Sequence, residues 1–285
     1  MSNTATVLAF DFGASSGRAI RAVYDGQNLT YEEIHRFENV PIEKDGHLCW
    51  DVETLLKEVH TAIQKAGTFD SLGFDTWGVD FGLLDADGHL LANPVHYRDA
   101  RTNGKPEQAA ACMPAEELYA HTGNQIMAIN TLFQLLALRE QEPELLQKAE
   151  QILFMPDLFA ALLGAEPVCE RSIASTSQML DPRTGQWSRE VLTAYGLKEN
   201  HFAPLVASGT VTGTLTTGAK IIAVAGHDTQ CASAAMPCAE EDAEHTAFLS
   251  CGTWSLLGTE LDTPILTADS CQSGLSNELG ANGKI

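Results

Sequence analysis

The stretch with the clearest chemical potential lies near the start of this 285-residue chain, at residues 7–24. An apolar, strand-forming run ends just after Asp11 and leads into a turn of small residues, Gly13, Ala14, Ser15, Ser16 and Gly17. Successive N–H groups of such a turn can converge on a phosphate, and the Asp11 carboxylate can hold a hydrated Mg²⁺ beside it. Taken alone, the stretch is more typical of an ordinary hairpin with a glycine-rich turn.

A second polar cluster follows the apolar run of residues 221–225. Gly226, His227, Asp228 and Thr229 come directly after this predicted buried strand, and the small residues that follow suit a close-packed helix. Polar side chains at the carboxyl end of a strand are typical of sites in α/β proteins. The cluster is therefore a second candidate for the site.

Residues 246–261 repeat the opening pattern of strand, small-residue turn and strand. The turn contains Ser250, Gly252, Thr253 and Ser255, but the repeat has no counterpart of Asp11. Two phosphate-binding hairpins that face each other across a cleft would clamp a nucleoside triphosphate. The pair is a far more specific signal than either hairpin alone.

The elements that must position these residues predict a mixed α/β fold. The predicted order is three antiparallel strands, then a helix, then a strand. By fold analogy, this order is typical of ribonuclease-H-like or actin-like nucleotide-binding domains. The predicted elements are strands up to residue 37, a helix from Asp51 to Gly67, a strand at 72–75, a hairpin turning at Asp87-Gly88, helices within 114–165, and a helix beginning near Ser188.

Composition limits the classes of function. The formal net charge is −21, from 38 acidic and 17 basic side chains, which argues against nucleic acid or an anionic membrane and favours a small-molecule or protein partner. Seven scattered cysteines and nine dispersed histidines predict free thiols and no tightly bound transition metal. Because no apolar run approaches the ~20 residues of a membrane span and no secretory segment precedes Asp11, we expect a cytoplasmic protein.

Six motifs together resemble one family. FDFGASSGR, DTWGVDFGLLD, HYRDARTN, TSQMLD, AGHDT and SCGTWSLLG, in this order, resemble the FGGY-type carbohydrate kinases of the actin/Hsp70/sugar-kinase superfamily over essentially the whole chain. The resemblance implies transfer of the ATP γ-phosphoryl group to a sugar hydroxyl, with Mg²⁺. Within the family, TWGVDFGLLD and GTWSLLG favour the branch that phosphorylates the ketose L-rhamnulose at its 1-hydroxyl, whereas AGHDTQ and TSQMLD look equally like the L-fuculose branch.

The resemblance also implies roles for residues around the phosphates. Asp228 matches the catalytic aspartate, which accepts the proton of the attacking hydroxyl, although an aspartate here can also cap the following helix. Asp11 would hold Mg²⁺ through a water molecule. The first phosphate loop would be Ala14, Ser15, Ser16, Gly17 and Arg18, and the second would include Thr253. Arg18 is equally explained as a surface ion-pair residue.

A second set of residues matches the sugar pocket of the family. Gly78 lets a substrate approach the backbone, and Asp80 can accept hydrogen bonds from sugar hydroxyls. His227 and Thr229 would flank the base and touch the sugar, and simple packing explains His227 as well. Trp77 can cover an apolar sugar face or pack in the core. The segment from Tyr97 to Arg101 lies near this pocket in the family, but a structural ion-pair cluster explains it equally.

The domain organisation follows from the same comparison. We interpret residues 1–240 as the N-terminal kinase domain and residues 241–285 as the start of a C-terminal ATP-binding domain, with the acidic residues near 240–244 as the boundary. Because the family's second domain continues far beyond residue 283, we expect a truncated chain with poor ATP binding and little or no kinase activity. A noncatalytic sugar- or nucleotide-binding module of the same fold is the alternative, and the intact Asp11 and Asp228 favour the kinase.

Overall fold

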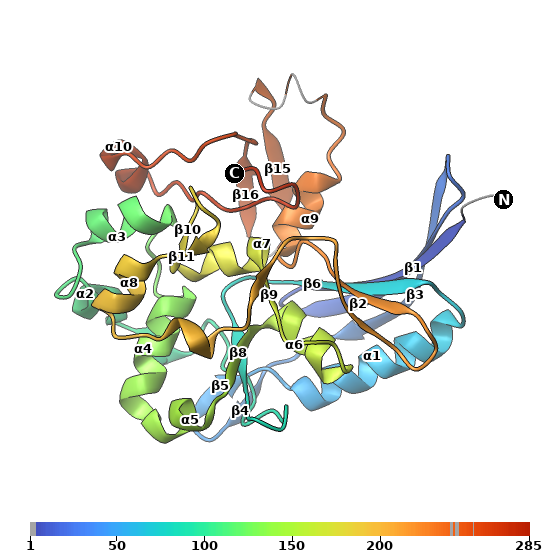
Figure 1. The fold of residues 1–285 in the computed structure, drawn as a ribbon, viewed down its shortest axis with the longest axis horizontal. Coiled ribbons are helices and arrows are strands. Elements are labelled where there is room, and N and C mark those ends of the chain that lie inside the picture. Colours follow the sequence, from blue (N-terminus) through green and yellow to red (C-terminus); the bar gives the residue numbers. More distant parts are fainter. Residues whose placement is uncertain (1–3, 240–241, 243–244, 253) are drawn as a thin grey trace.

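A six-stranded mixed sheet forms the centre of the computed structural model, which describes residues 4–239, 242, 245–252 and 254–285 (Figure 1). The strand order is β13–β14–β6–β1–β2–β3. Pairing is parallel between β1 and β6 and between β6 and β14, and antiparallel for the other neighbours. The strands are β1 (Ala5–Phe12), β2 (Ser16–Tyr24), β3 (Leu29–Glu38), β6 (Ser71–Thr76), β13 (Thr210–Thr214) and β14 (Lys220–Ala223).

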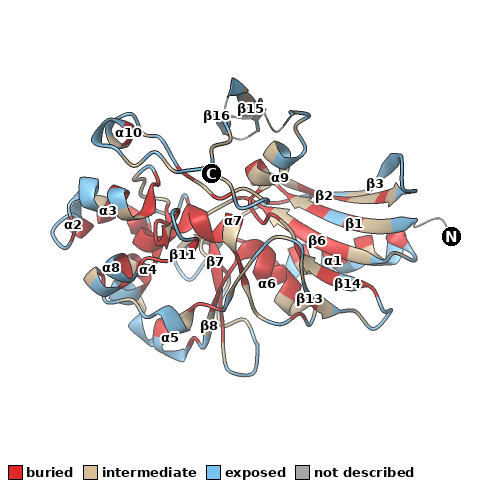
Figure 2. Ribbon diagram, turned by 45° about the horizontal axis from the view of Figure 1, so that its top comes forward, coloured by how far each residue is buried: buried red, intermediate tan, exposed pale blue. Residues whose placement is uncertain are grey.

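One face of this sheet is covered by α1 (Val52–Ala66) and α6 (Met155–Leu162), which lie on the same side in both ribbon views (Figures 1 and 2). The side chains of Leu8, Phe10 and Phe12 alternate along β1 toward this face and are fully buried. The predicted helix ends are confirmed: the Asp51 side chain accepts a hydrogen bond from the Thr54 N–H, and the helix ends at Gly67. The sheet and these two helices form the core of the molecule.

Shorter helices form a second region beside the sheet and are mostly linked by loops (Figure 1). The predicted start of a helix near Ser188 is confirmed, because the Ser188 side chain accepts a hydrogen bond from the Val191 N–H. The helices are α2 (Lys105–Ala109), α3 (Ala115–Thr122), α4 (Thr131–Gln141), α5 (Pro143–Lys148), α7 (Arg171–Ala174), α8 (Arg189–Ala194) and α10 (Ala268–Gln272), with 3-10 turns η1 (Ala100–Thr102), η2 (Ser175–Ser177) and η3 (Glu199–His201).

Five pairs of short strands complete the part of the fold that the structure describes. They are β4 (Ile42–Lys44) with β5 (His47–Cys49), β7 (Phe81–Leu84) with β8 (Gln151–Phe154), β9 (Cys169–Glu170) with β12 (Leu205–Val206), β10 (Leu180–Asp181) with β11 (Gln186–Trp187), and β15 (Phe248–Cys251) with β16 (Ser255–Gly258). The β15–β16 pair is the predicted second hairpin.

The hairpin predicted at Asp87-Gly88 forms only in part. The chain turns there, but Leu84 and Leu90 make a single bridge, and the ladder partner of β7 is β8, a strand that the sequence analysis did not predict. All four residues of β7 are buried, so this strand needs a partner from the interior. The largely buried strand β8 is that partner.

The end of the chain returns to the region of shorter helices. After β16, residues 259–285 run back over α3 and α7, where the buried Asn277 side chain donates to the Gly123 carbonyl at 3.1 Å and the Leu279 N–H donates to Ser175 Oγ at 3.0 Å. Leu279 is part of the main hydrophobic core. Within the described residues no helix has the length and apolar character needed to cross a membrane.

Candidate active site

A cavity of about 640 Å³ lies between the β1–β2 turn, residues 77–79, the start of α9 (Asp228–Ala234) and the β15–β16 hairpin. It brings together most of the residues that the sequence analysis selected, which are Asp11, Ala14, Ser15, Ser16, Arg18, Gly78, His227, Asp228 and Thr229. Gly17 and Asp80 lie behind its walls. Thr253 lies outside the described residues, although Ser250 and Gly252 of the same turn line the cavity. The two predicted hairpins therefore border one space.

The turn between β1 and β2 lines this cavity and carries N–H groups that have no acceptor among the described residues. Three of its carbonyl groups are occupied: Ser16 O accepts from the Gly13 N–H at 2.9 Å, and Asn39 donates to Ser15 O at 3.0 Å and to Gly13 O at 2.9 Å. The N–H groups of Ala14 and Ser15 have no acceptor within the described part of the chain. Such a turn fits a phosphate group, because its unpaired N–H groups can donate to the anion's oxygens.

Asp11 and Arg18 lie opposite each other on β1 and β2 and form an ion pair. Arg18 Nε donates to Asp11 Oδ2 at 2.7 Å, and both side chains are part-exposed in the cavity wall. The two interpretations of Arg18 are thus compatible, since it is paired and also faces the cavity. A carboxylate beside free N–H donors suits a hydrated Mg²⁺ that accompanies a polyphosphate.

Gly17 has a packing role that the sequence analysis did not predict. It is buried, and a Cβ atom at this position would lie 2.2 Å from Cζ of Phe37. The missing side chain therefore makes room for the Phe37 ring under the turn. Gly17 thus has a packing role and does not line the cavity, and its predicted phosphate contact stays a prediction.

The wall at residues 77–79 has a strained backbone that other elements hold in place. Val79 has a φ of 68°, a left-handed conformation that a β-branched residue adopts only when its surroundings impose it. Its N–H donates to Thr176 Oγ1 at 3.1 Å, and its carbonyl accepts from Thr131 Oγ1 at 2.6 Å. Gly78 lies beside it in the cavity wall, where a Cβ would be 3.2 Å from the Thr176 methyl group. Hydrogen bonds from Thr131 and to Thr176 therefore hold this backbone conformation in the cavity wall.

Asp80 lies beneath this wall and does not reach the cavity. It is fully buried, and its carboxylate accepts four hydrogen bonds, from Trp50 Nε1 (2.6 Å), Trp77 Nε1 (3.0 Å), the Tyr97 N–H (3.1 Å) and Gln134 Nε2 (2.8 Å). Burial raises the pKa of Asp80 to about 6, although all four donors favour the charged form. The predicted sugar contact is corrected: Asp80 orients Trp77 and Tyr97, which do line the cavity.

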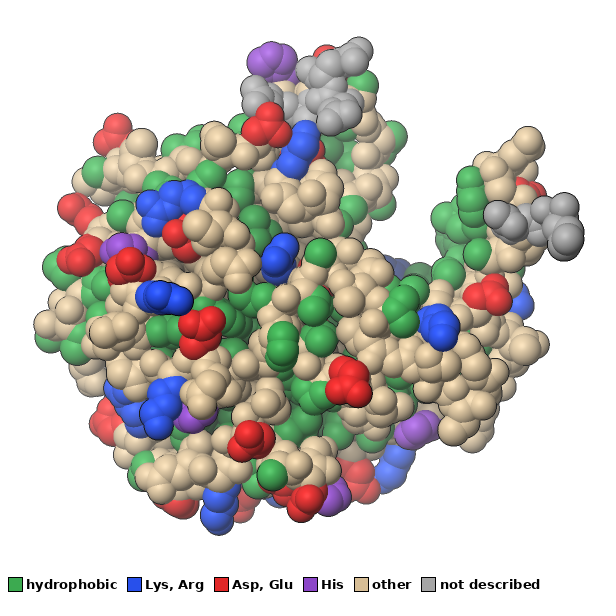
Figure 3. Space-filling view, in the orientation of Figure 1, with side chains coloured by type: hydrophobic (Ala, Val, Ile, Leu, Met, Phe, Trp, Pro, Cys, Tyr) green, Lys and Arg blue, Asp and Glu red, His purple; other side chains and the backbone are tan. Residues whose placement is uncertain are grey.

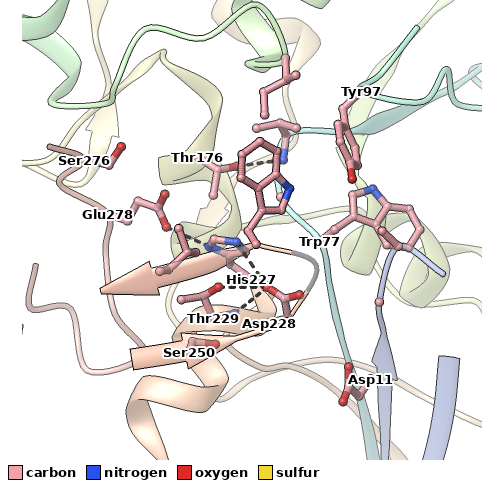
Figure 4. Close-up of a pocket in the computed structure, with 18 of the residues that line it drawn as sticks. Asp11, Trp77, Tyr97, Thr176, His227, Asp228, Thr229, Ser250, Ser276 and Glu278 are labelled. Atoms are coloured by element: carbon pink, nitrogen blue, oxygen red, sulfur yellow. Dashed lines mark hydrogen bonds and ion pairs between the residues drawn. The ribbon is translucent and has the colours of Figure 1, made fainter. Parts of the chain in front are cut away.

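Asp228 is the first residue of α9, and a chain of polar contacts extends from it (Figure 4). Its Oδ1 accepts from the Thr229 N–H at 2.6 Å and lies 3.4 Å from His227 Nε2. The other ring nitrogen of His227, Nδ1, lies 2.9 Å from Glu278 Oε2. The residue at the N-cap position of α9 is His227, so Asp228 does not have the predicted alternative role of helix cap.

The charges around Asp228 shift its proton affinity in opposite directions. Burial raises the pKa of the Asp228 carboxyl, and the neighbouring His227 lowers it. Burial and the carboxylates of Asp11 and Asp228 raise the pKa of Asp75, at the end of β6, well above its usual value. Although burial disfavours the imidazolium, Glu278 and then Asp228 and Asp75 raise the pKa of His227 to about 9. His227 is therefore a cation among carboxylates at neutral pH.

Comparison with known proteins identifies the family. The N-terminal domain of the FGGY family of carbohydrate kinases matches residues 6–234. The chain belongs to the FGGY family. It is also 41% identical to a rhamnulokinase from Bacteroides thetaiotaomicron, in an alignment that covers 98% of this chain and 59% of that protein. The FGGY chain thus spans less than two thirds of this relative's length.

Solved structures share the fold of this FGGY chain. Gluconate kinase from Lactobacillus acidophilus superposes with a TM-score of 0.80 at 17% identity, over 94% of this chain and 56% of that one. Glycerol kinase from Plasmodium falciparum, solved with ADP, superposes with a TM-score of 0.71 at 16% identity, over 90% of this chain and 54% of that one. The predicted α/β sugar-kinase fold is confirmed.

Several cavity residues of the FGGY chain, among them Glu278 and Asn124, were missed by the sequence analysis, which left the role of Tyr97 open. Glu278 contacts His227 from a position 51 residues further along the chain. The Tyr97 hydroxyl and Asn124 Oδ1 are buried in the cavity wall without a hydrogen-bond partner in the described structure. The predicted HYRDARTN segment was a signal for Tyr97, whereas nothing in the sequence singles out Asn124 or Glu278.

Proposed function

We propose that this FGGY kinase phosphorylates L-rhamnulose at its 1-hydroxyl, with ATP as the donor, to give L-rhamnulose 1-phosphate. One observation carries the proposal: a single cavity holds the free N–H groups of the phosphate turn on one side and the Asp228 carboxylate on another. The likeness to a rhamnulokinase supports this sugar as the substrate.

In this mechanism Asp228 acts as the general base. The sugar oxygen forms a bond to the γ-phosphorus as the bond from that phosphorus to the bridging oxygen of ADP breaks, and the hydroxyl proton passes to the Asp228 carboxylate. The Thr229 N–H, which donates to Asp228 Oδ1 at 2.6 Å, fixes the orientation of the carboxylate. A carboxylate suffices as the base because the hydroxyl becomes acidic only as the new bond forms.

The phosphate turn and Asp11 would hold the nucleotide. The N–H groups of Ala14 and Ser15 and the hydroxyl groups of Ser15 and Ser16 are the donors for phosphate oxygens, with Arg18 adding positive charge. Asp11 would hold Mg²⁺ through a water molecule, and the ion would neutralise part of the phosphate charge.

The sugar would occupy the opposite part of the cavity. Gly78 exposes backbone there, and His227 and Thr229 lie next to the base. The unpartnered Tyr97 hydroxyl and Asn124 Oδ1 offer further partners for sugar hydroxyls, because a buried polar group without a partner is costly until a ligand supplies one. These groups make the pocket wall suited to a polyhydroxylated ligand.

The domain boundary, the compartment and the activity of the 285 residues remain predictions. We place the boundary near residue 240, which the end of the family match at residue 234 supports. We propose the cytoplasm as the compartment because the donor is ATP. The expectation of little or no turnover by these 285 residues is tested by the assay below.

The test separates sugar binding from turnover. Calorimetry with L-rhamnulose, L-fuculose and ATP, each titrated alone, measures which ligands bind, and a coupled ADP assay measures phosphorylation. We expect L-rhamnulose to bind more tightly than L-fuculose. Asp228→Asn is expected to lower any measured turnover by about 10²- to 10⁴-fold, because the base is lost, while sugar affinity changes little.

Asp87→Asn is the matched control, since it removes one carboxylate in an exposed turn outside the cavity. Failure to bind either sugar would contradict the proposed substrate class. Sugar or nucleotide binding with wild-type turnover in Asp228→Asn would remove Asp228 as the base. Binding without any turnover is the result expected of these 285 residues, and measurable turnover that Asp228→Asn abolishes would contradict that expectation.

A further inference from the structure

His227 lies between two carboxylates that come from distant parts of the chain. Its Nδ1 is 2.9 Å from Glu278 Oε2, and its Nε2 is 3.4 Å from Asp228 Oδ1 (Figure 4). A neutral imidazole has one N–H and can donate to only one of them, whereas an imidazolium donates from both nitrogens. The ring is buried, so solvent does little to screen these contacts.

Glu278 is held in place by the residues on both sides of it. The buried Asn277 side chain donates to the Gly123 carbonyl at 3.1 Å, and its Oδ1 accepts from the Ile265 N–H at 2.7 Å. On the other side, the Leu279 side chain is buried in the core. With both neighbours anchored, the backbone at Glu278 is fixed and its carboxylate is directed at His227.

We propose that Glu278 is a positioning residue for the base: it orients the His227 ring and holds it as an imidazolium, which in turn keeps the Asp228 carboxyl ionised. The proposal rests on the general-base role proposed above for Asp228. The sequence resemblance assigned His227 only to sugar contact, and assigned no role to Glu278.

The surrounding charges show why Asp228 needs this support. Burial raises the pKa of the Asp228 carboxyl, and the carboxylate of Asp11 on β1 raises it further. Asp228 in turn helps to raise the pKa of Asp75 on β6, so negative charges are crowded around the base. Arg18 on β2 is paired with Asp11. Among the described residues, the cation paired with the Asp228 carboxylate is His227, the residue before it. Glu278, from the C-terminal segment, is the main group that favours the charged form of His227.

The sign of the effect follows from these contacts. With Glu278 present, His227 stays charged up to a pH of about 9, so Asp228 is stabilised as a carboxylate throughout the neutral range. Without the Glu278 charge, burial lowers the pKa of His227, and the neutral ring no longer stabilises the Asp228 anion. The base then becomes protonated at a higher pH than in the unaltered chain.

The decisive measurement is the titration of His227 by ¹H–¹⁵N NMR on the ¹⁵N-histidine-labelled 285-residue chain, which requires neither sugar nor turnover. The His227 signal is assigned by its loss in His227→Gln. In the unaltered chain we expect both ring nitrogens to be protonated at pH 7.5, with a midpoint near 9. A neutral ring at pH 7.5 in the unaltered chain would overturn the proposal without any variant.

Glu278→Gln is expected to move this midpoint about 1 to 3 pH units lower, the usual effect of losing one close opposite charge. Glu278→Asp keeps the charge on a shorter side chain and is expected to restore part of the difference. Glu260→Gln is the matched control, because Glu260 also forms an ion pair within the C-terminal segment, with Lys284, and its partners do not include His227. Equal midpoints in Glu278→Gln and Glu260→Gln would overturn the proposal.

The kinetic measurement then tests the link to the base. If the chain turns over, the acidic limb of the pH profile of kcat/KM is expected to shift to higher pH in Glu278→Gln and to stay unchanged in Glu260→Gln. An unshifted limb together with a lowered His227 midpoint would overturn the link to Asp228. Absence of turnover in the unaltered chain bears on the proposed function, whereas the NMR titration still decides whether Glu278 holds the charge on His227.

Discussion

The cavity is bordered by two strand–turn–strand units, β1–β2 and β15–β16, whose turns have similar compositions. The first belongs to the central sheet, where Phe12 is fully buried and its ring centroid lies 5.2 Å from that of Phe37. The second is a two-stranded pair, and Leu249 and Leu257 are 62% and 75% exposed. Figure 3 shows hydrophobic side chains at the surface of this part of the molecule.

The comparison shows that two turns of similar composition can differ in how firmly the surrounding structure supports them. Small and hydroxyl residues make a phosphate-sized turn possible in both units. Only the first is held by neighbouring strands on both sides and by aromatic packing underneath. A lone pair of strands has little stability of its own. The two turns should therefore respond very differently to similar substitutions.

The largest expected effect is on the aromatic packing below the first turn. Phe12→Ala is expected to lower the free energy of unfolding by about 3 to 5 kcal/mol, because it empties a fully buried ring site next to Phe159. Leu257→Ala, in the second unit, should change it by less than about 0.5 kcal/mol. Urea unfolding followed by circular dichroism measures both. Similar losses in the two variants would contradict the proposed difference in support.

A smaller effect is expected at the glycines of the two turns. Gly17→Ala should cost about 1 to 3 kcal/mol, since its Cβ would collide with the Phe37 ring. Gly252→Ala places its Cβ 3.9 Å from the Trp254 carbonyl oxygen, an ordinary contact, and should cost little. The same unfolding measurement applies. A Gly17→Ala chain as stable as the unaltered one would show that the ring moves aside freely.

The smallest effect on stability is expected at the ion pair beside the first turn. Arg18→Ala should change the free energy of unfolding by less than about 1 kcal/mol, because the pair with Asp11 is part-exposed and screened by solvent. The same variant should weaken ATP binding in calorimetry, because it removes positive charge from the cavity wall. An unchanged ATP affinity would assign Arg18 to the ion pair alone.

Much of the fold was predictable because local signals defined it. The alternation along β1, the Asp51 cap and the repeated hairpin pattern each lie within a short stretch of sequence. Strand β8 was missed because its four residues lie between helical segments, and only their pairing with β7 makes them a strand. Such pairing depends on tertiary contacts that periodicity does not encode.

The site was predictable to the extent that its residues lie in motifs. Asp11 and Asp228 were selected from their place near strand ends, and both line the cavity. Asp80 and Gly17 belong to the same motifs, but their burial depends on Trp50 and Phe37, which approach from elsewhere in the chain. Glu278 reaches His227 only because the chain folds back after β16. Motifs therefore indicated the neighbourhood of the site and not the contacts within it.

The tryptophans around the cavity give the protein its own optical reporter. Trp77 and Trp254 line the cavity, whereas Trp50 and Trp187 are buried in the core. The Trp77 ring lies 3.9 Å from that of Trp50 and donates to Asp80, so its environment depends on the cavity wall. Intrinsic fluorescence should therefore report ligand entry without a label. The variants Trp77→Phe and Trp254→Phe would distinguish a change near the cavity wall at residues 77–79 from one near the β15–β16 hairpin.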